Sequence, residues 1–229
     1  MIDEAPLLTV RRNFARPSEA QAAALRGAPT CFLADALGGR GALDAAIRPI
    51  DEQNAAFLGV AITCHTGPAD NLAAFGALEA LRPGDVVVAA TDRFLKTAVI
   101  GDLYFGMARN RGCAAFVTDG AVRDIVGLRA VGMPCFAAGV TPNSPARNGP
   151  GTVGAAVVIG GVSVESGDII AGDIDGVVVV PRNEIDRVIA RLADVLKAEA
   201  ALDAKVREGL ELPEFVAKLY AAGRVKEIG

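Results

Sequence analysis

The sequence contains very little histidine and no tryptophan. His65 is the only histidine, and aromatic residues make up 5% of the 229 residues. A single histidine excludes a His-rich zinc site, and it leaves a Ser-His-Asp triad possible only if His65 serves in it. We interpret His65 as a polar residue at the end of a strand.

Paired cysteines and long apolar runs are also missing. Cys31, Cys64, Cys113 and Cys135 are widely spaced and form no CxxC pair, which favours free thiols over a disulfide framework. No run reaches the length of about 18 uncharged apolar residues that a membrane helix needs. The first residues are acidic and lack the basic-then-apolar order of a signal peptide. We therefore expect a cytoplasmic protein with no membrane partner.

Charge is sparse and slightly acidic. Charged residues account for 22% of the chain and the net charge is −4. Binding to nucleic acid needs clustered Lys and Arg, so this balance argues against a nucleic-acid partner. Hydrophobic residues make up 52%, which is ample for a large core and indicates apolar surface where subunits pack together.

The first half of the chain has the pattern of alternating strands and helices. We expect an irregular N-terminal arm over residues 1–16, followed by a helix that Ser18 caps and Gly27 ends. Two apolar strands then flank an amphipathic helix, which predicts a crossover unit with parallel strands. These elements are the strand 57–64, the helix 68–81 and the strand 85–90.

The second half adds one more strand–helix–strand unit and then turns into short β segments. The predicted elements are a strand over 114–118, a helix over 122–131, a strand over 134–138 and a loop over 141–151. Hairpin turns are expected at Gly160-Gly161, Gly167-Asp168 and Asp175-Gly176, then a long helix from an Asn183 cap to about Gly209, and a short helix over 214–222. The pattern predicts one mixed α/β layered sandwich over residues 1–229, with a helical tail over 182–229.

The stretch from Gly101 to Asp124 carries the residues that suggest chemistry. Asp102 opens a helical run, and Arg123 and Asp124 follow the next strand, with twenty residues between Asp102 and Arg123. One helix and one returning strand fill about that length, so both ends can meet in space. We also expect neighbouring Arg123 and Asp124 to point to different sides, one toward a cation and the other toward a substrate.

This set of side chains suits a 2-oxo acid and a divalent cation. Mg²⁺ or Mn²⁺ binds through one or two carboxylates and keeps several waters. The backbone N–H groups of Leu103 and Tyr104 lie where a helix begins, and they can hold a substrate carboxylate. The forked donors of Arg123 can stabilise a developing enolate oxygen. The structural alternatives are that Asp102 is a helix cap, Arg123 and Asp124 a surface pair, and Asp119 a turn residue.

Four segments of the chain resemble the RraA-like and pyruvate-aldolase family. They read DNLAAFGALEALRPGDVVVA, GDLYFGMARNRGCAAFVTDGAVRD, GMPCFAAGVTP and GGVSVESGDIIAGDIDGVVVVP, and the resemblance covers about residues 30–181. The resemblance implies an α-β-β-α sandwich of the swivelling-domain type, assembled as trimers or hexamers with sites at subunit contacts. It also implies a metal-dependent aldolase that releases pyruvate from a 4-hydroxy-2-oxo diacid and decarboxylates oxaloacetate.

The resemblance also implies a role for each residue of the site. Asp124 is similar to the metal-binding carboxylate, Asp102 to its partner through water, and Arg123 to the contact for pyruvate and the enolate oxygen. Gly101, Leu103 and Tyr104 match the backbone that holds the pyruvyl carboxylate. Glu199 matches an acid from a neighbouring subunit, although Glu208 or Glu211 could be the aligned residue.

The family also contains a regulator that binds and inhibits a ribonuclease, in which the Arg-Asp pair is typically broken. The intact pair here favours the enzyme. Members often carry His near Phe75 and Trp near Ile100, and here the segment 91–96 replaces a glycine-rich loop. These departures leave the identity of the distal substrate group open. A methyltransferase is disfavoured because no Gly-rich loop follows the first strand.

Overall fold

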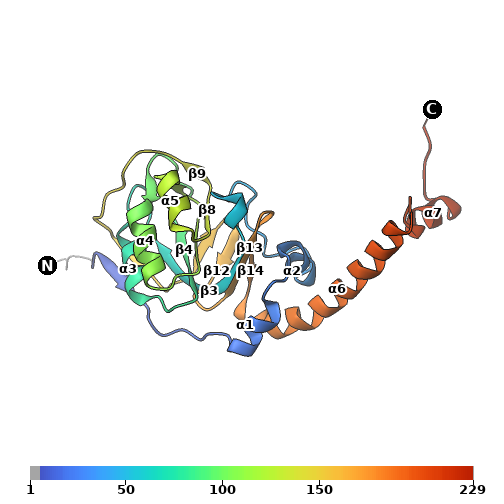
Figure 1. Ribbon diagram of the computed structural model, residues 1–229, viewed down its shortest axis with the longest axis horizontal. Helices are drawn as coiled ribbons and strands as arrows, with labels where there is room; N and C mark the ends of the chain where they lie inside the picture. The colour runs from blue at the N-terminus through green and yellow to red at the C-terminus, as the bar shows by residue number, and fades with distance from the viewer. Residues whose placement is uncertain (1–5, 229) are drawn as a thin grey trace.

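The computed structural model describes residues 6–228 and shows layers of helix and sheet. Figure 1 shows α3, α4 and α5 together on one side of the sheet, with α1, α2 and the start of α6 on the other side of the body. Both halves of the chain supply strands to the large sheet. The second half completes it and ends in a projecting helical tail.

Parallel strands form the centre of the large sheet. The strands are β3 (Phe57–His65), β4 (Asp85–Ala90), β6 (Ala115–Thr118) and β8 (Cys135–Ala137), which pair in that order. The helices that follow the first three are α3 (Leu72–Ala80), α4 (Asp102–Asn110) and α5 (Ile125–Val131). This is the repeated strand–helix–strand crossover that the two halves of the sequence together predict.

Short strands complete the large sheet and add two smaller ones. The remaining strands of the large sheet are β1 (Leu8–Val10), β2 (Arg48–Pro49), β10 (Gly151–Val153), β13 (Ile169–Asp173) and β14 (Gly176–Val180). A separate hairpin consists of β11 (Val157–Ile159) and β12 (Val162–Val164). A three-stranded parallel sheet consists of β5 (Ala98–Ile100), β7 (Ala121–Val122) and β9 (Gly139–Val140).

Three apolar clusters hold the layers together. One lies between α3, α4, α5 and the parallel strands, around Phe105 and Phe116. The second lies between the opposite face of those strands and the β11–β12 hairpin, around Phe136. The third joins β13 and β14 to α1 (Glu19–Leu25), α2 (Thr30–Ala36) and the start of α6 (Ile185–Arg207). The order of layers is therefore α-β-β-α, as expected.

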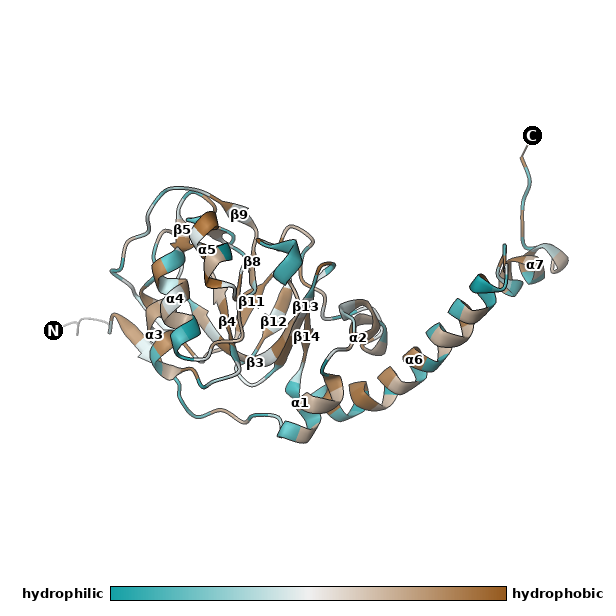
Figure 2. Ribbon diagram, viewed as in Figure 1, coloured by the Kyte–Doolittle hydropathy of each residue, from teal (hydrophilic) through white to brown (hydrophobic). Residues whose placement is uncertain are grey.

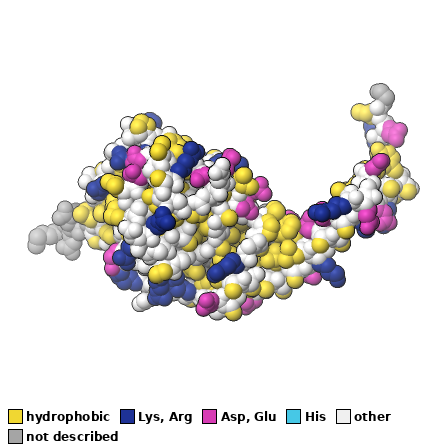
Figure 3. Space-filling view, in the orientation of Figure 1, with side chains coloured by type: hydrophobic (Ala, Val, Ile, Leu, Met, Phe, Trp, Pro, Cys, Tyr) yellow, Lys and Arg dark blue, Asp and Glu magenta, His cyan; other side chains and the backbone are white. Residues whose placement is uncertain are grey.

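The C-terminal tail leaves the body. Helix α6 projects away with α7 (Glu214–Ala221) at its far end, and polar and apolar residues alternate along it (Figures 1 and 2). Several of its large apolar side chains are exposed, among them Leu202, Val206 and Phe215, and Figure 3 shows apolar side chains along this region. No helix within residues 6–228 is both long and apolar enough to span a bilayer.

Most of the predicted elements are confirmed. Ser18 caps α1 through a reciprocal capping box with Gln21. The Gly160-Gly161 and Asp175-Gly176 turns each close a hairpin, and the loop after residue 141 connects β9 to β10. All four cysteines are free thiols. Of the predicted N-terminal arm, residues 1–5 lie outside the described residues.

Four expectations about local structure are wrong. Leu8–Val10 is a strand, because it pairs with β10 at the sheet edge. Helix α3 is not amphipathic, since the sheet, the β1–β10 edge and α4 cover several of its faces. Asn183 is not a cap: the 3₁₀ turn η2 (Arg182–Glu184) precedes α6 and places Glu184 at the N-cap. Gly167-Asp168 is no hairpin turn, because β13 pairs with β3 and β14 rather than with β12.

Phe116 gives a direct test of the core. Its side chain is fully buried in β6, and its ring meets the edge of Tyr104 with centroids 5.6 Å apart. Phe116→Ala should lower the free energy of unfolding by about 3–5 kcal/mol, because the surrounding layers cannot collapse into the cavity. Phe116→Leu keeps most of the volume and should cost less than about 1.5 kcal/mol. Urea unfolding measures both, and equal losses would contradict this view of the core.

Candidate functional site

A pocket of about 240 Å³ lies at the N-terminal end of α4. It is lined by residues from the end of β5, the first turn of α4, the β7–α5 junction, the start of α3 and the loop after β9. Asp102, Arg123 and Asp124 all line it. The prediction that the two ends of this stretch meet in space is therefore confirmed.

Two aspartates and two glycines fit against one another where α4 and α5 begin. Gly101 is the N-cap of α4, and a Cβ there would lie 2.2 Å from the Asp124 Oδ2 atom. Gly127 lies in the first turn of α5, and a Cβ there would lie 2.4 Å from the Asp102 Oδ2 atom. Each carboxylate thus occupies the space that a side chain of the other helix would fill, and this fixes both at the pocket.

Arg123 and Asp124 contact each other instead of pointing to different sides. The Arg123 Nε atom lies 3.2 Å from the Asp124 Oδ2 atom, and Arg123 Nη1 also donates to Ser144 Oγ. The expectation of opposite directions fails because Asp124 is in the left-handed conformation, with φ 59° and ψ 46°. This turn of the backbone brings both side chains to one pocket. A cation bound by Asp124 and a substrate bound by Arg123 would therefore lie next to each other.

The carboxylate of Asp124 is available to a cation. It stands at the N-cap of α5 but makes no side-chain capping bond, and its side chain is 41% exposed. Within the described residues no three His, Cys, Asp or Glu side chains come together as a closed metal site. Such a sparse, hard-oxygen set does not suit zinc, but it fits Mg²⁺ or Mn²⁺, which retain several waters.

The first turn of α4 presents backbone donors to the same pocket. The N–H groups of Asp102, Leu103 and Tyr104 have no partner within the helix, because they belong to its first turn. The Leu103 side chain is 80% exposed, whereas the Tyr104 side chain is buried and donates to the Ala74 carbonyl at 3.0 Å. Burial raises the pKa of Tyr104 well above its usual value, so its phenol stays neutral. Tyr104 can therefore serve the pocket only through its backbone.

The pocket side chains that sequence reasoning missed include Asn71, Phe75, Ser144 and Arg147. Asn71 and Phe75 lie at the start of α3, and Arg147 lies in the loop between β9 and β10. The sequence offers only a weak signal for them, an Asp-Asn pair before a helix and one arginine in a loop rich in Pro, Asn and Gly. Their joint position depends on how that loop folds back onto α3.

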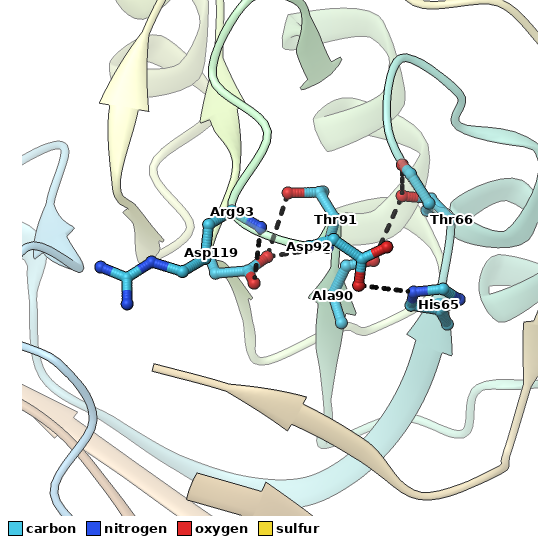
Figure 4. Close-up of polar contacts among 8 residues, drawn as sticks. His65, Thr66, Ala90, Thr91, Asp92, Arg93 and Asp119 are labelled. Atoms are coloured by element: carbon cyan, nitrogen blue, oxygen red, sulfur yellow. Dashed lines mark hydrogen bonds and ion pairs between the residues drawn. The ribbon is translucent and has the colours of Figure 1, made fainter. Parts of the chain in front are cut away.

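A second polar cluster, at the carboxyl ends of β3, β4 and β6, is structural. Buried Asp119 accepts hydrogen bonds from the Thr91 N–H at 2.7 Å, the Thr91 hydroxyl at 3.0 Å and the Arg93 N–H at 3.1 Å, and Asp92 points toward His65 (Figure 4). His65 ends β3 as expected, with its Nε2 atom 2.9 Å from Asp92 Oδ1. Asp119 is more than a turn residue: it holds the loop that leads into β5 and so to the pocket.

Of the residues that the structure describes, no cysteine lines the pocket, and exposed Cys31 lies elsewhere on the surface. Cys64, Cys113 and Cys135 are buried in the core. Burial raises the pKa of Cys64 to about 12 and that of Cys113 to about 11. Neutral thiols of this kind are unreactive.

Glu199 does not belong to the pocket of its own chain. It lies in the exposed part of α6, in the segment that projects from the body (Figure 1). A role in the site would require the helix of another subunit, and that role stays a prediction.

Comparison with known proteins identifies the family to which this sequence is similar. The sequence profile of the RraA-like family, described as Aldolase/RraA, matches residues 30–179. The chain belongs to the RraA-like family. All the residues of the predicted site except Glu199 fall within the matched region.

Three of the similar proteins carry names of two kinds, an aldolase and an inhibitor of RNA processing. A protein of Halalkalibacterium halodurans, whose name proposes 4-hydroxy-4-methyl-2-oxoglutarate aldolase activity, is 37% identical over 72% of this chain and 79% of its own. The structure of an RNA-processing inhibitor RraA from Thermus thermophilis has a TM-score of 0.62 and 30% identity, over 67% of this chain and 93% of its own. Streptomyces coelicolor RraAS2, described as an unusual member of the RNase ES inhibitor family, has a TM-score of 0.71 and 26% identity, over 83% and 100% of the two chains.

The glycine at the N-cap of α4 can be tested against a matched glycine within the same helix. Gly101→Ala places a methyl group against the Asp124 carboxylate and should displace it, at a cost of about 1–3 kcal/mol. Gly106→Ala is the control, because nothing lies within 4 Å of a Cβ at that position. It should leave the carboxylate in place and stabilise the helix slightly. Crystal structures and thermal unfolding of both variants measure this, and an unmoved Asp124 in Gly101→Ala would refute the packing described here.

Proposed function

We propose that this protein is a divalent-metal-dependent lyase that cleaves a 4-hydroxy-2-oxo diacid to pyruvate and also decarboxylates oxaloacetate. The observation that carries the proposal is the convergence of Asp102, Arg123 and Asp124 at the N-terminus of α4 in one pocket. The name of the Halalkalibacterium relative supports the same class of reaction.

The substrate carboxylate would bind at the first turn of α4. The backbone from Gly101 to Tyr104 supplies N–H donors there, and the partial positive charge of the helix end favours an anion. Arg123, held by Asp124 and Ser144, would direct its remaining donors to the 2-oxo oxygen. Carbons C3 and C4 would then lie toward Asn71 and Phe75, which line the same pocket from the start of α3.

The cation would be held by Asp124 directly and by Asp102 through water. When bound, Mg²⁺ or Mn²⁺ supplies Lewis-acid stabilisation of the charge that develops on the 2-oxo group. Asp102 lies against α5 and faces the same pocket, so it is placed to keep water in a fixed orientation. Arg123 adds a second positive charge that stays with the enolate oxygen.

The reaction balances through a pyruvate enolate. The C4 hydroxyl loses its proton to a base, the C3–C4 bond breaks, and its electron pair moves into the enolate while C4 leaves as a carbonyl compound. Protonation at C3 then gives pyruvate. With oxaloacetate, carbon dioxide leaves from C3 and the same enolate forms. We assign proton transfer to Asp102 and its water, and to Glu199 of a neighbouring subunit.

A homo-oligomer, a trimer or a hexamer, would bring Glu199 to the site. The exposed apolar residues of α7 and of the far part of α6 support such an assembly, because these side chains would gain burial by packing against another copy.

The alternative is a non-catalytic regulator that binds and inhibits a ribonuclease. The names of the Thermus and Streptomyces relatives suggest it. It predicts that loss of the Asp124 carboxylate has no effect on function and that a partner bound in a pull-down survives chelation. The retained Asp102, Arg123 and Asp124 favour the enzyme.

Asp124→Asn tests the proposal without disturbing the backbone. Asparagine tolerates the left-handed conformation, so the fold should persist. Pyruvate release from oxaloacetate with Mg²⁺ or Mn²⁺, measured by coupling to lactate dehydrogenase, should fall by at least about 100-fold. Asp92→Asn is the matched control, because Asp92 is also left-handed and exposed but lies beside His65 outside the pocket. It should retain wild-type activity, and equal activity of all three proteins would exclude the proposal.

Complementation tests the shared site. Asp124→Asn and Glu199→Gln should each be nearly inactive as purified proteins. When they are co-expressed in equal amounts, about a quarter of the sites would combine an intact Asp124 with an intact Glu199 from a neighbouring chain. Activity should then rise toward a quarter of the wild-type value. Full activity of Glu199→Gln alone would remove Glu199 from the mechanism, and no recovery in the mixed oligomer would exclude a site shared between subunits. Neither result would change the role of Asp124.

A further inference from the structure

The pocket contains a second arginine that the proposed chemistry does not use. Arg147 is exposed, and its guanidinium carbon lies 5.0 Å from the centroid of the Phe75 ring. Within residues 6–228 it forms no ion pair with a carboxylate, whereas Arg123 is paired with Asp124. An arginine stacked on an aromatic ring keeps its forked donors available for a carboxylate.

The loop that carries Arg147 is held in place from both sides. The Asp70 carboxylate accepts from the Asn148 N–H at 2.6 Å and the Gly149 N–H at 3.1 Å, and the backbone of Ala146 bonds with that of Ala69 at 2.7 Å and Asn71 at 3.1 Å. At the other end of the loop, Asn143 donates to the Lys96 carbonyl at 2.9 Å. The Arg147 backbone is therefore preorganised beside α3, which reduces the entropy that ligand binding would cost.

Asn71 leaves a buried acceptor at the same wall of the pocket. Its side chain is 4% exposed and donates from Nδ2 to the Val99 carbonyl at 3.1 Å. Its Oδ1 atom has no hydrogen-bond partner within the described residues. An unpaired buried acceptor is costly, and a ligand hydroxyl could satisfy it. This wall of the pocket thus offers two groups to a ligand. Asn71 Oδ1 can accept a hydrogen bond from a hydroxyl, and the Arg147 guanidinium can bind an anion.

We infer that Arg147 and Asn71 form the subsite for the distal end of the substrate, with Arg147 binding its second carboxylate and Asn71 Oδ1 accepting from its C4 hydroxyl. The inference rests on the proposed function, which places the 2-oxo acid end at α4 and Arg123. Asn71 and Arg147 line the same pocket as Arg123 and the first turn of α4, so one substrate could contact both sets of residues. Arg147 would then determine the preference for diacids over monoacids.

The test compares two substrates that differ only at the distal group. These are 4-hydroxy-2-oxoglutarate, a diacid, and 4-hydroxy-2-oxopentanoate, which has a methyl group in place of the second carboxylate. Arg147→Met should lower the ratio of their kcat/KM values by about 10- to 100-fold, the size expected for a lost charged hydrogen bond. Arg147→Lys should recover part of the ratio, since it keeps the charge without the fork.

Arg11→Met is the control, because it removes the same charge from an exposed arginine outside the pocket. It should leave the ratio as in the wild type. An unchanged ratio in Arg147→Met, with both substrates still cleaved, would overturn the inference and leave the proposed function standing.

Binding of non-cleavable ligands separates the inference from the proposed chemistry. Isothermal titration with 2-oxoglutarate and 2-oxopentanoate, in the presence of Mg²⁺, should show tighter binding of the diacid by wild-type protein and loss of that preference in Arg147→Met. If the wild type cleaves neither hydroxy acid but keeps this preference, the proposed lyase fails and the subsite stands. Equal binding of both ligands by the wild type would overturn the subsite.

Discussion

The site depends on the close approach of the N-termini of α4 and α5. Gly101 leaves room for the Asp124 carboxylate, and Gly127 leaves room for that of Asp102. Because the interior is packed without spare volume, neither helix can shift without moving an acid of the other. The arrangement presents two carboxylates, the Arg123 guanidinium and the first amides of α4 at one pocket. The parallel strands and the large side chains beneath them, such as Phe105 and Phe116, hold both helices at this distance.

The apolar pattern predicts the elements of the fold well. Strands such as 57–64 and 85–90 are buried on both faces, so their continuous apolar runs are unambiguous. Errors arise where tertiary contacts decide the local structure. Residues 8–10 become a strand only because β10 lies beside them, and β13 leaves the preceding hairpin because β3 offers a partner. Neither partner can be identified from neighbouring residues alone.

In the candidate site, too, local features could be predicted from the sequence and features set by tertiary contacts could not. Asp102, Arg123 and Asp124 could be predicted because one helix and one strand separate them, which is a local argument. The directions of the side chains could not, since the left-handed conformation of Asp124 reverses the usual alternation. Asn71 and Arg147 could not be predicted together, because only the hydrogen bonds of Asp70 and Ala146 bring the loop onto α3. The 75 residues between Asn71 and Arg147 carry no signal that would bring the two together.

The left-handed residue at the head of α5 has a consequence for how the family can diverge. A left-handed backbone strongly favours glycine, asparagine or aspartate, and one base change in an aspartate codon reaches either of the other two. Such a mutation would remove the negative charge while the chain still folds. The proposed activity could therefore be lost in one genetic step without loss of the scaffold. A descendant of this kind would remain available for selection as a binding protein.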